Sequence, residues 1–135
     1  MRKALARAGI EPGAVSHVNA HATGTPVGDL AEARAIEEVF GSHGVPVTAP
    51  KASLGHLVGA AGAVEALVAI LSVEQDVIPP TRNLADTAVD PEVGLEIVTE
   101  RREAVQHAVL TNSFGFGGQN VSLLFTKHAD EEACG

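Results

Sequence analysis

The apolar segment 57–73, LVGAAGAVEALVAILSV, constrains the fold more than any other stretch, because its one charged residue is Glu65. Its length approaches that of a membrane-spanning helix, but it is rich in Ala and Gly and contains a carboxylate. We therefore interpret it as a buried helix of a soluble domain rather than as a membrane span. Such a helix has to pack against other elements of the same domain.

Glu65 needs compensation for its charge if this helix is buried. A buried carboxylate costs several kcal/mol of stability unless it is paired. Lys51 is the nearest candidate partner along the chain. The alternative is a solvent-facing Glu65 beside a surface Lys51, and the residues alone leave both interpretations open.

Strand-like and helix-like segments alternate along the rest of the chain. Helical periodicity predicts helices at the N-terminus, with Gly9 as the stop, over 30–40 and over 57–74. Asp29 and Glu32 have the spacing of a capping box, and Gly41 follows the second helix. β-forming segments predict strands over 15–21, 45–50, 95–100, 107–113 and 121–127, and a Pro-punctuated loop over 77–94. This order predicts an α/β fold with a mixed sheet.

Length and charge limit the organisation and the partners. A chain of 135 residues can bury one core, and we expect one domain over 1–127 and a disordered acidic tail over 128–135. The formal net charge of −8 argues against a nucleic-acid partner and against binding to an anionic membrane surface. Cys134 is the single cysteine, and no apolar stretch typical of a signal peptide follows the N-terminal residues, so we expect a reducing, cytoplasmic location. A helix that starts at Met1 without a cap suggests that a preceding segment is missing.

The stretch 19–29, NAHATGTPVGD, is the first candidate site. His21 follows a predicted strand and precedes a predicted helix, which is where α/β proteins build ligand sites. An imidazole there can donate a hydrogen bond or move a proton. Thr23 and Thr25 offer hydroxyl groups to a polar ligand. The alternative is that His21 is a structural histidine and that the threonines only shape a turn.

The next strand-to-helix connection carries Lys51 and His56. Because both connections leave strands of what we expect to be one sheet, His21 and His56 should converge at its C-terminal edge.

Three other kinds of site are disfavoured. His21 and His56 lack further ligands at a known zinc spacing, so we expect no metal site. The stretch GFGGQN resembles a dinucleotide loop, but a predicted strand follows it where a helix is required. Cys134 lies in the tail, without a positioned base to activate it as a nucleophile.

Four motifs in this order, VNAHATGTPVGD, KASLGHLVGAAGAVEA, IPPTRNL and NSFGFGGQN, resemble the C-terminal half of the β-ketoacyl-[acyl-carrier-protein] synthases. These are the condensing enzymes of fatty acid and polyketide synthesis. Ala22, where many members have Gly, is similar to the long-chain branch of the mycolic-acid pathway. The resemblance implies a thiolase-like fold, whose C-terminal half has a mixed five-stranded sheet with helices on both faces, in an enzyme that usually dimerises.

The resemblance also implies roles for the candidate residues. The family uses a cysteine and two histidines to condense malonyl-acyl carrier protein with an acyl thioester, and His21 and His56 match those catalytic histidines. Lys51 and Glu65 match a supporting pair. Thr23 and Thr25 match hydroxyls that meet the phosphopantetheine arm, which arrives on the acyl carrier protein, so no resident cofactor is implied. Phe114 and Phe116 match the glycine loop at the entrance to the acyl pocket.

One departure from the family pattern limits these implications. The nucleophilic cysteine is absent, and Cys134 does not match its position or context. We therefore expect this chain alone to be inactive in condensation and to need an N-terminal half that carries the cysteine. Two alternatives are a non-catalytic partner subunit that docks on a synthase, and cysteine-independent decarboxylation of malonyl groups. An apolar face made for the other half would leave the isolated chain prone to self-association.

Overall fold

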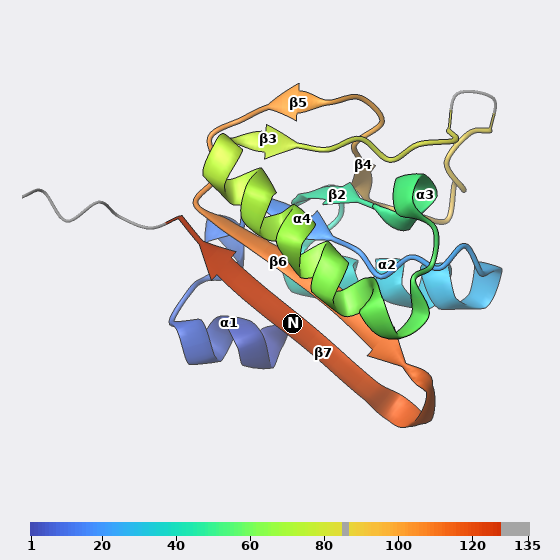
Figure 1. The fold of residues 1–135 in the computed structure, drawn as a ribbon, viewed down its shortest axis with the longest axis horizontal. Helices are drawn as coiled ribbons and strands as arrows, with labels where there is room; N and C mark the ends of the chain where they lie inside the picture. Colours follow the sequence, from blue (N-terminus) through green and yellow to red (C-terminus); the bar gives the residue numbers. More distant parts are fainter. Residues whose placement is uncertain (85–86, 128–135) are drawn as a thin grey trace, which may run out of the picture.

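The computed structural model describes residues 1–84 and 87–127. Five strands form one sheet in the order β4-β2-β1-β6-β7, and Figure 1 shows the long β6–β7 hairpin at its edge. All neighbouring strands are parallel except β6 and β7, which are antiparallel. This confirms the predicted mixed five-stranded sheet, with strands β1 (His17–Asn19), β2 (Pro46–Thr48), β4 (Glu96–Ile97), β6 (Ala108–Gly115) and β7 (Gln119–Thr126). The predicted acidic tail and Cys134 lie outside the described residues.

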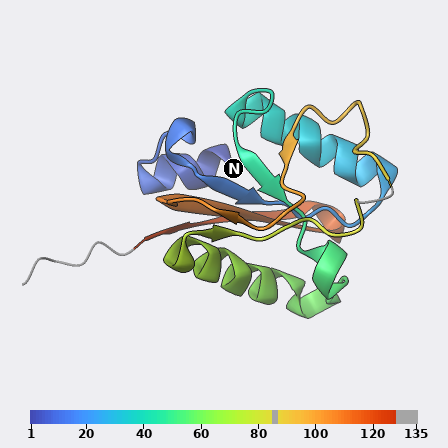
Figure 2. The ribbon, with the colours of Figure 1, turned by 90° about the horizontal axis from the view of Figure 1, so that it is seen from above.

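Helices cover both faces of this sheet, as Figure 2 shows. Helices α1 (Arg2–Ala8) and α2 (Pro26–Phe40) lie on one face, and α4 (Ala61–Gln75) lies on the other. Gly9 ends α1 in the left-handed conformation, as its position predicted. The short helix α3 (Lys51–Leu54), the 3₁₀ helices η1 (Pro12–Ala14), η2 (Val58–Ala60) and η3 (Phe116–Gly118), and a small antiparallel pair of β3 (Val77–Ile78) and β5 (Arg102–Glu103) complete the fold.

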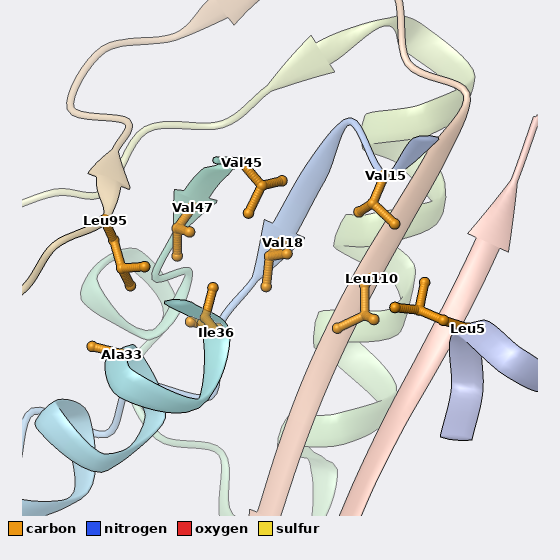
Figure 3. Close-up of a cluster of buried hydrophobic side chains, with 10 residues drawn as sticks. Leu5, Val15, Val18, Ala33, Ile36, Val45, Val47, Leu95 and Leu110 are labelled. Carbon is orange, nitrogen blue, oxygen red and sulfur yellow. The ribbon is translucent and has the colours of Figure 1, made fainter. Parts of the chain in front are cut away.

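Strand β1 sends alternate side chains to the two faces, since successive side chains of a strand point in opposite directions. Val18 joins the larger apolar cluster, which lies between the sheet and helices α1 and α2 (Figure 3). His17 and Asn19 instead face α4, where His17 Nδ1 lies 3.3 Å from Ser72 Oγ and Asn19 Nδ2 donates to Glu65 O. The polar side of β1 therefore meets α4, and the apolar side meets α2.

The predicted capping box at Asp29 and Glu32 is wrong. Helix α2 begins four residues before the predicted start at Leu30, at Pro26, whose fixed φ suits the first helical position. Asp29 Oδ1 accepts a hydrogen bond from Gly24 N at 3.2 Å. Glu32 is buried and turns toward the sheet instead of toward the helix end. Its carboxylate accepts hydrogen bonds from the loop that carries His21.

Helix α4 is buried on one face only in the described chain. Its inner face, with Ala69 and Val73, packs against Val109 and Phe125 of the sheet. On its outer face Leu67 is 59% exposed and Leu71 is 50% exposed. The expectation of a buried helix thus holds for half of its circumference, because nothing in the described residues covers the other half. By length and composition alone, Val58–Gln75 could cross a membrane, but the core helix of a globular domain passes the same test.

Candidate active site

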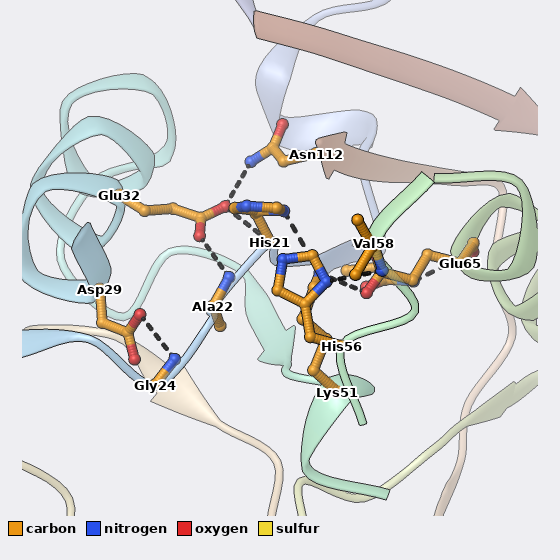
Figure 4. A network of polar contacts seen from close by, with 11 residues as sticks. His21, Ala22, Gly24, Asp29, Glu32, Lys51, His56, Val58, Glu65 and Asn112 are labelled. Atoms are coloured by element: carbon orange, nitrogen blue, oxygen red, sulfur yellow. Dashed lines mark hydrogen bonds and ion pairs between the residues drawn. The ribbon is translucent and has the colours of Figure 1, made fainter. Parts of the chain in front are cut away.

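His21 lies directly beyond the C-terminal end of β1, in a loop whose backbone is hydrogen-bonded to Glu32. The backbone N–H groups of His21 and Ala22 donate to the two carboxylate oxygens of Glu32, at 2.9 and 2.8 Å. Asn112 Nδ2 on β6 donates to the same carboxylate at 3.0 Å. Burial raises the pKa of Glu32, and these hydrogen bonds act in the opposite direction. Glu32 therefore ties β1, α2 and β6 together at the base of His21 (Figure 4).

His56 lies in the second connection, between α3 and η2. Val58 N donates to His56 Nδ1 at 3.1 Å. Val58 itself adopts a φ of 50°, which a β-branched residue rarely accepts. The imidazole rings of His21 and His56 meet edge to face, with their centroids 5.9 Å apart. The predicted convergence of the two histidines is confirmed.

Lys51 and Glu65 form a buried ion pair beside these histidines. Lys51 Nζ donates to Glu65 Oε1, and the two side chains are only 5% and 3% exposed. The same ammonium lies 3.2 Å from His21 Nδ1. The prediction that Glu65 is buried and pairs with Lys51 is confirmed, and the alternative of two solvent-facing residues is wrong.

Both imidazoles are held in the same tautomer. An ammonium and a backbone N–H can only donate, so Nδ1 of His21 and of His56 are acceptors and the hydrogen is on Nε2. Burial lowers the pKa of His21, and the positive charges of Lys51 and His56 lower it further, whereas Asp29 acts in the opposite direction. His21 is therefore a neutral donor near pH 7.

Three buried oxygens on β1, α4 and β6 have no hydrogen-bond partner among the described residues. They are Asn19 Oδ1, Glu65 Oε2 and Thr111 Oγ1. Such acceptors suit a water molecule or a hard cation. In the part of the chain that the structure describes, no group of three or more His, Cys, Asp or Glu side chains could hold a metal ion.

Thr23 and Thr25 lie on the loop beside His21, with their hydroxyl oxygens 3.3 Å apart. Gly28 passes so close that a Cβ there would lie 2.5 Å from Thr25 Oγ1. The missing side chain of Gly28 thus leaves room for the Thr25 hydroxyl on the exposed side of the loop.

The two phenylalanines of the glycine loop lie in different surroundings. The rings of Phe114, near the end of β6, and of His21 meet in a T-shaped arrangement with their centroids 5.5 Å apart. Phe116 is fully exposed at the tip of the hairpin, where Gly117 and Gly118 have positive φ. Phe114 therefore packs within the candidate site, whereas Phe116 extends away from the described chain.

Glu32 and Asn112 are site residues that the sequence analysis missed. Glu32 lies beside Ala33 on the buried face of α2, and this position on the helix could have indicated that Glu32 is buried. Its spacing from Asp29 matched a capping box equally well, so the pattern pointed to the wrong partner. Asn112 gave no separate signal because it lies inside a strand motif.

Known proteins share both the sequence and the architecture of this chain. The family model of the β-ketoacyl synthase C-terminal domain matches residues 1–85. The 3-oxoacyl-[acyl-carrier-protein] synthase 2 of Mycobacterium tuberculosis (strain ATCC 25618 / H37Rv) is 50% identical over 127 residues, which are 93% of this chain and 30% of that protein. The chain thus spans about a third of the length of such curated relatives.

Solved structures agree with this assignment. A β-ketoacyl synthase from Burkholderia phymatum STM815 superposes with a TM-score of 0.89 at 39% identity, over 96% of this chain and 31% of that one. A type II polyketide ketosynthase, solved in complex with its acyl-carrier protein, superposes with a TM-score of 0.88 at 28% identity, over 94% and 31%. These likenesses confirm the thiolase-like fold expected from the motifs. The chain belongs to the β-ketoacyl synthase C-terminal domain family.

Proposed function

We propose that this chain supplies the two-histidine half of the active site of a β-ketoacyl-[acyl-carrier-protein] synthase. The observation that carries the proposal is the pair of imidazoles whose ring centroids lie 5.9 Å apart. Each Nδ1 accepts a hydrogen bond from the protein, so each Nε2–H is left to donate to a substrate. Two such donors at the C-terminal edge of the sheet suit one oxygen that becomes negatively charged during a reaction.

The proposed reaction is a decarboxylative Claisen condensation. The bond between the α-carbon and the carboxylate of a malonyl thioester breaks, CO₂ leaves, and the electron pair forms an enolate. His21 and His56 stabilise the enolate oxygen by donating from Nε2. The α-carbon then attacks an acyl thioester carbonyl, forms the new carbon–carbon bond and releases the thiolate of the cysteine that held the acyl chain. That cysteine belongs to a part of the synthase outside these 135 residues.

The other site residues support this chemistry in the proposal. Lys51, paired with Glu65, holds His21 in the donor tautomer. Thr23 and Thr25 offer hydroxyls to the phosphopantetheine arm of the acyl carrier protein, so the chain needs no resident cofactor. Phe114 packs beside His21, and the exposed Phe116 is available at the entrance of the acyl pocket.

An exposed apolar surface suits the cysteine-bearing N-terminal half as the partner. Leu67 and Leu71 on the outer face of α4 are exposed, and so are Val121 and Leu123 on β7. The latter two point to the same side of the sheet as Phe125, which packs against α4. Apolar side chains grouped in this way mark an interaction site. We propose that the N-terminal half covers this surface within a homodimeric, cytoplasmic synthase that receives its substrates on acyl carrier protein.

Reconstitution tests this function. The chain is mixed with the N-terminal part of a 3-oxoacyl-acyl carrier protein synthase, and two-carbon elongation of an acyl thioester by malonyl-acyl carrier protein is followed by mass spectrometry. We expect no elongation by the chain alone and elongation by the mixture. His21→Gln and His56→Gln should each lower the rate at least about 100-fold, whereas the exposed His43→Gln is the matched control and should leave it unchanged.

Two results would contradict the proposal or favour an alternative. Elongation by the chain alone would show that the cysteine half is not required. Binding to a complete synthase, with an altered rate that does not depend on His21 or His56, would favour a non-catalytic partner subunit. Release of CO₂ from malonyl-acyl carrier protein by the chain alone, and its loss in His56→Ala, would support cysteine-independent decarboxylation.

A further inference from the structure

Lys51 occupies the centre of the site, yet its own local structure is weak. It begins α3, a helix of four residues that follows Pro50. A single helical turn is not stable by itself, because few hydrogen bonds offset the entropy of fixing it. Within the described residues, no side chain caps the start of this helix. The position of the Lys51 ammonium therefore depends on contacts made by the backbone on either side of it.

Two side chains from a distant segment make those contacts. Thr81 Oγ1 accepts a hydrogen bond from Ala49 N at 3.0 Å, just before the helix. Asn83 Nδ2 donates to the carbonyl oxygen of Ala52 at 3.2 Å, and Ala52 directly follows Lys51 in α3. Both belong to the motif IPPTRNL, for which the proposed reaction provides no role. Lys51 is thus held on both flanks by one three-residue segment.

The Thr81 end of this segment is anchored in the sheet. Thr81 is buried, and its own N–H donates to Val98 O at 2.7 Å. Val98 N in turn donates to Val47 O of β2 at 2.9 Å. The hydrogen bond from Ala49 N to Thr81 therefore connects the residues before Lys51 to strand β2 of the sheet.

Asn83 has the backbone conformation that its contact requires. Its φ is 66°, in the left-handed region that Asn and Gly tolerate better than other residues. This bend directs the side-chain amide back toward Ala52, although Asn83 itself is exposed.

We propose that Thr81 and Asn83 are positioning residues for Lys51, whose ammonium they hold between His21 and Glu65 through the backbone of Ala49 and Ala52. The inference rests on the function proposed for His21, because the position of the Lys51 ammonium matters for the reaction only if it holds His21 in the donor tautomer. The simpler alternative is that both side chains only stabilise the loop.

The titration of His21 separates these alternatives. The charged or titratable groups that face His21 are Lys51, His56, Asp29 and Glu32. Lys51 disfavours the imidazolium, so an ammonium that moves away should raise the pKa of His21. Loss of its hydrogen bond should also change the ¹⁵N chemical shift of Nδ1. Loss of stability elsewhere in the domain predicts neither change.

The test uses the full chain with ¹⁵N-labelled histidine and NMR across a pH series, with His21→Gln to assign the signal. Thr81→Val removes the acceptor at nearly constant volume, and Thr81→Ser keeps it. Asn83→Gly removes the amide and keeps the left-handed backbone. Ile36 lies on the buried face of α2, in an apolar cluster that does not include Lys51, so Ile36→Val is the matched control that lowers stability elsewhere.

We expect Thr81→Val and Asn83→Gly to raise the pKa of His21 and shift its Nδ1 signal, while Thr81→Ser and Ile36→Val titrate like the unchanged chain. The Ala49 amide should exchange with solvent about five- to tenfold faster in Thr81→Val, as for loss of one ordinary hydrogen bond. An unchanged His21 titration in both Thr81→Val and Asn83→Gly would overturn the proposal. If Thr81→Val does not fold, the exposed Asn83→Gly decides. Because this readout needs no elongation activity, it can succeed where reconstitution fails.

Discussion

Glu65→Gln should be among the most destabilising single changes of a charged residue in this domain. The Lys51 and Glu65 side chains are 5% and 3% exposed, so the substitution leaves a buried ammonium without its counter-charge. Breaking a buried pair from one side typically costs about 3–5 kcal/mol. The new amide oxygen can still accept from Lys51 Nζ, so we expect the lower end, about 3 kcal/mol of unfolding free energy.

A double variant separates the value of the pair from the cost of breaking it. Replacing both partners, as Lys51→Met with Glu65→Leu, removes the two charges together and fills similar volume. We expect this variant to unfold within about 1–2 kcal/mol of the unchanged chain, because buried pairs offset their own desolvation only narrowly. The pair would then be retained for the donor tautomer of His21 and not for stability.

Urea unfolding followed by far-UV circular dichroism measures these effects, since the chain has no Trp or Tyr for fluorescence. Glu103→Gln is the surface control, because Glu103 pairs with Arg101 on exposed side chains and should lose less than about 1 kcal/mol. If Glu65→Gln lost no more stability than Glu103→Gln, the burial argument for Lys51 and Glu65 would be refuted.

Three further predictions concern other parts of the domain. Burial lowers the pKa of His17 from 6.5 to about 3, so as pH falls the unfolded chain takes up a proton on His17 before the folded chain does. The stability that comes from neutral His17 is therefore complete above pH 6.5 and is lost as pH falls toward about 3. At pH 5 the free energy of unfolding should be lower by about 2 kcal/mol. Urea titrations in a pH series check this, and His17→Gln should flatten the slope. Gly44→Ala places a Cβ 1.9 Å from Phe40 O and should cost about 1–3 kcal/mol in the same assay, whereas Gly13→Ala, with open space around it, should be nearly neutral. Val58→Gly removes the steric strain of a φ of 50° and should raise the unfolding free energy by up to about 1 kcal/mol. Val105→Gly is the control, because Val105 is exposed and has no positive φ, and it should lower the unfolding free energy. A lower unfolding free energy in Val58→Gly would contradict the strain.

The sheet and the convergence of the histidines could be predicted because each depends on local patterns joined by one topological rule. β-forming residues located the strands that matter, although β1 is shorter than its predicted segment. Two connections that leave neighbouring parallel strands open at the same edge of the sheet, so the sequence pattern predicts that His21 and His56 lie close together. The pairing of Lys51 with Glu65 followed from the cost of burying charge.

The features that escaped prediction depend on distant contacts. The two-residue strands β3 and β5 pair across a long separation and have no periodicity of their own. Glu32 satisfied a local capping rule and a tertiary role equally well, and tertiary burial decided between them. The positive φ of Val58 runs against the propensity of a β-branched residue, so a propensity scale does not predict it. Phe114 and Phe116 belong to one motif, but Phe114 packs against His21 and Phe116 is exposed, because they occupy different places on the hairpin.

The two histidines are held in the same tautomer by different donors, and this indicates what the site can do. The tautomer of His56 is fixed by a backbone N–H, that of Val58. His21 is fixed by the Lys51 ammonium, whose charge also opposes protonation of the ring. A general base needs a free acceptor nitrogen, but both acceptor nitrogens here are already occupied by protein donors. The arrangement therefore favours stabilisation of a developing negative charge over proton transfer, in agreement with the proposed loss of CO₂ from a malonyl group.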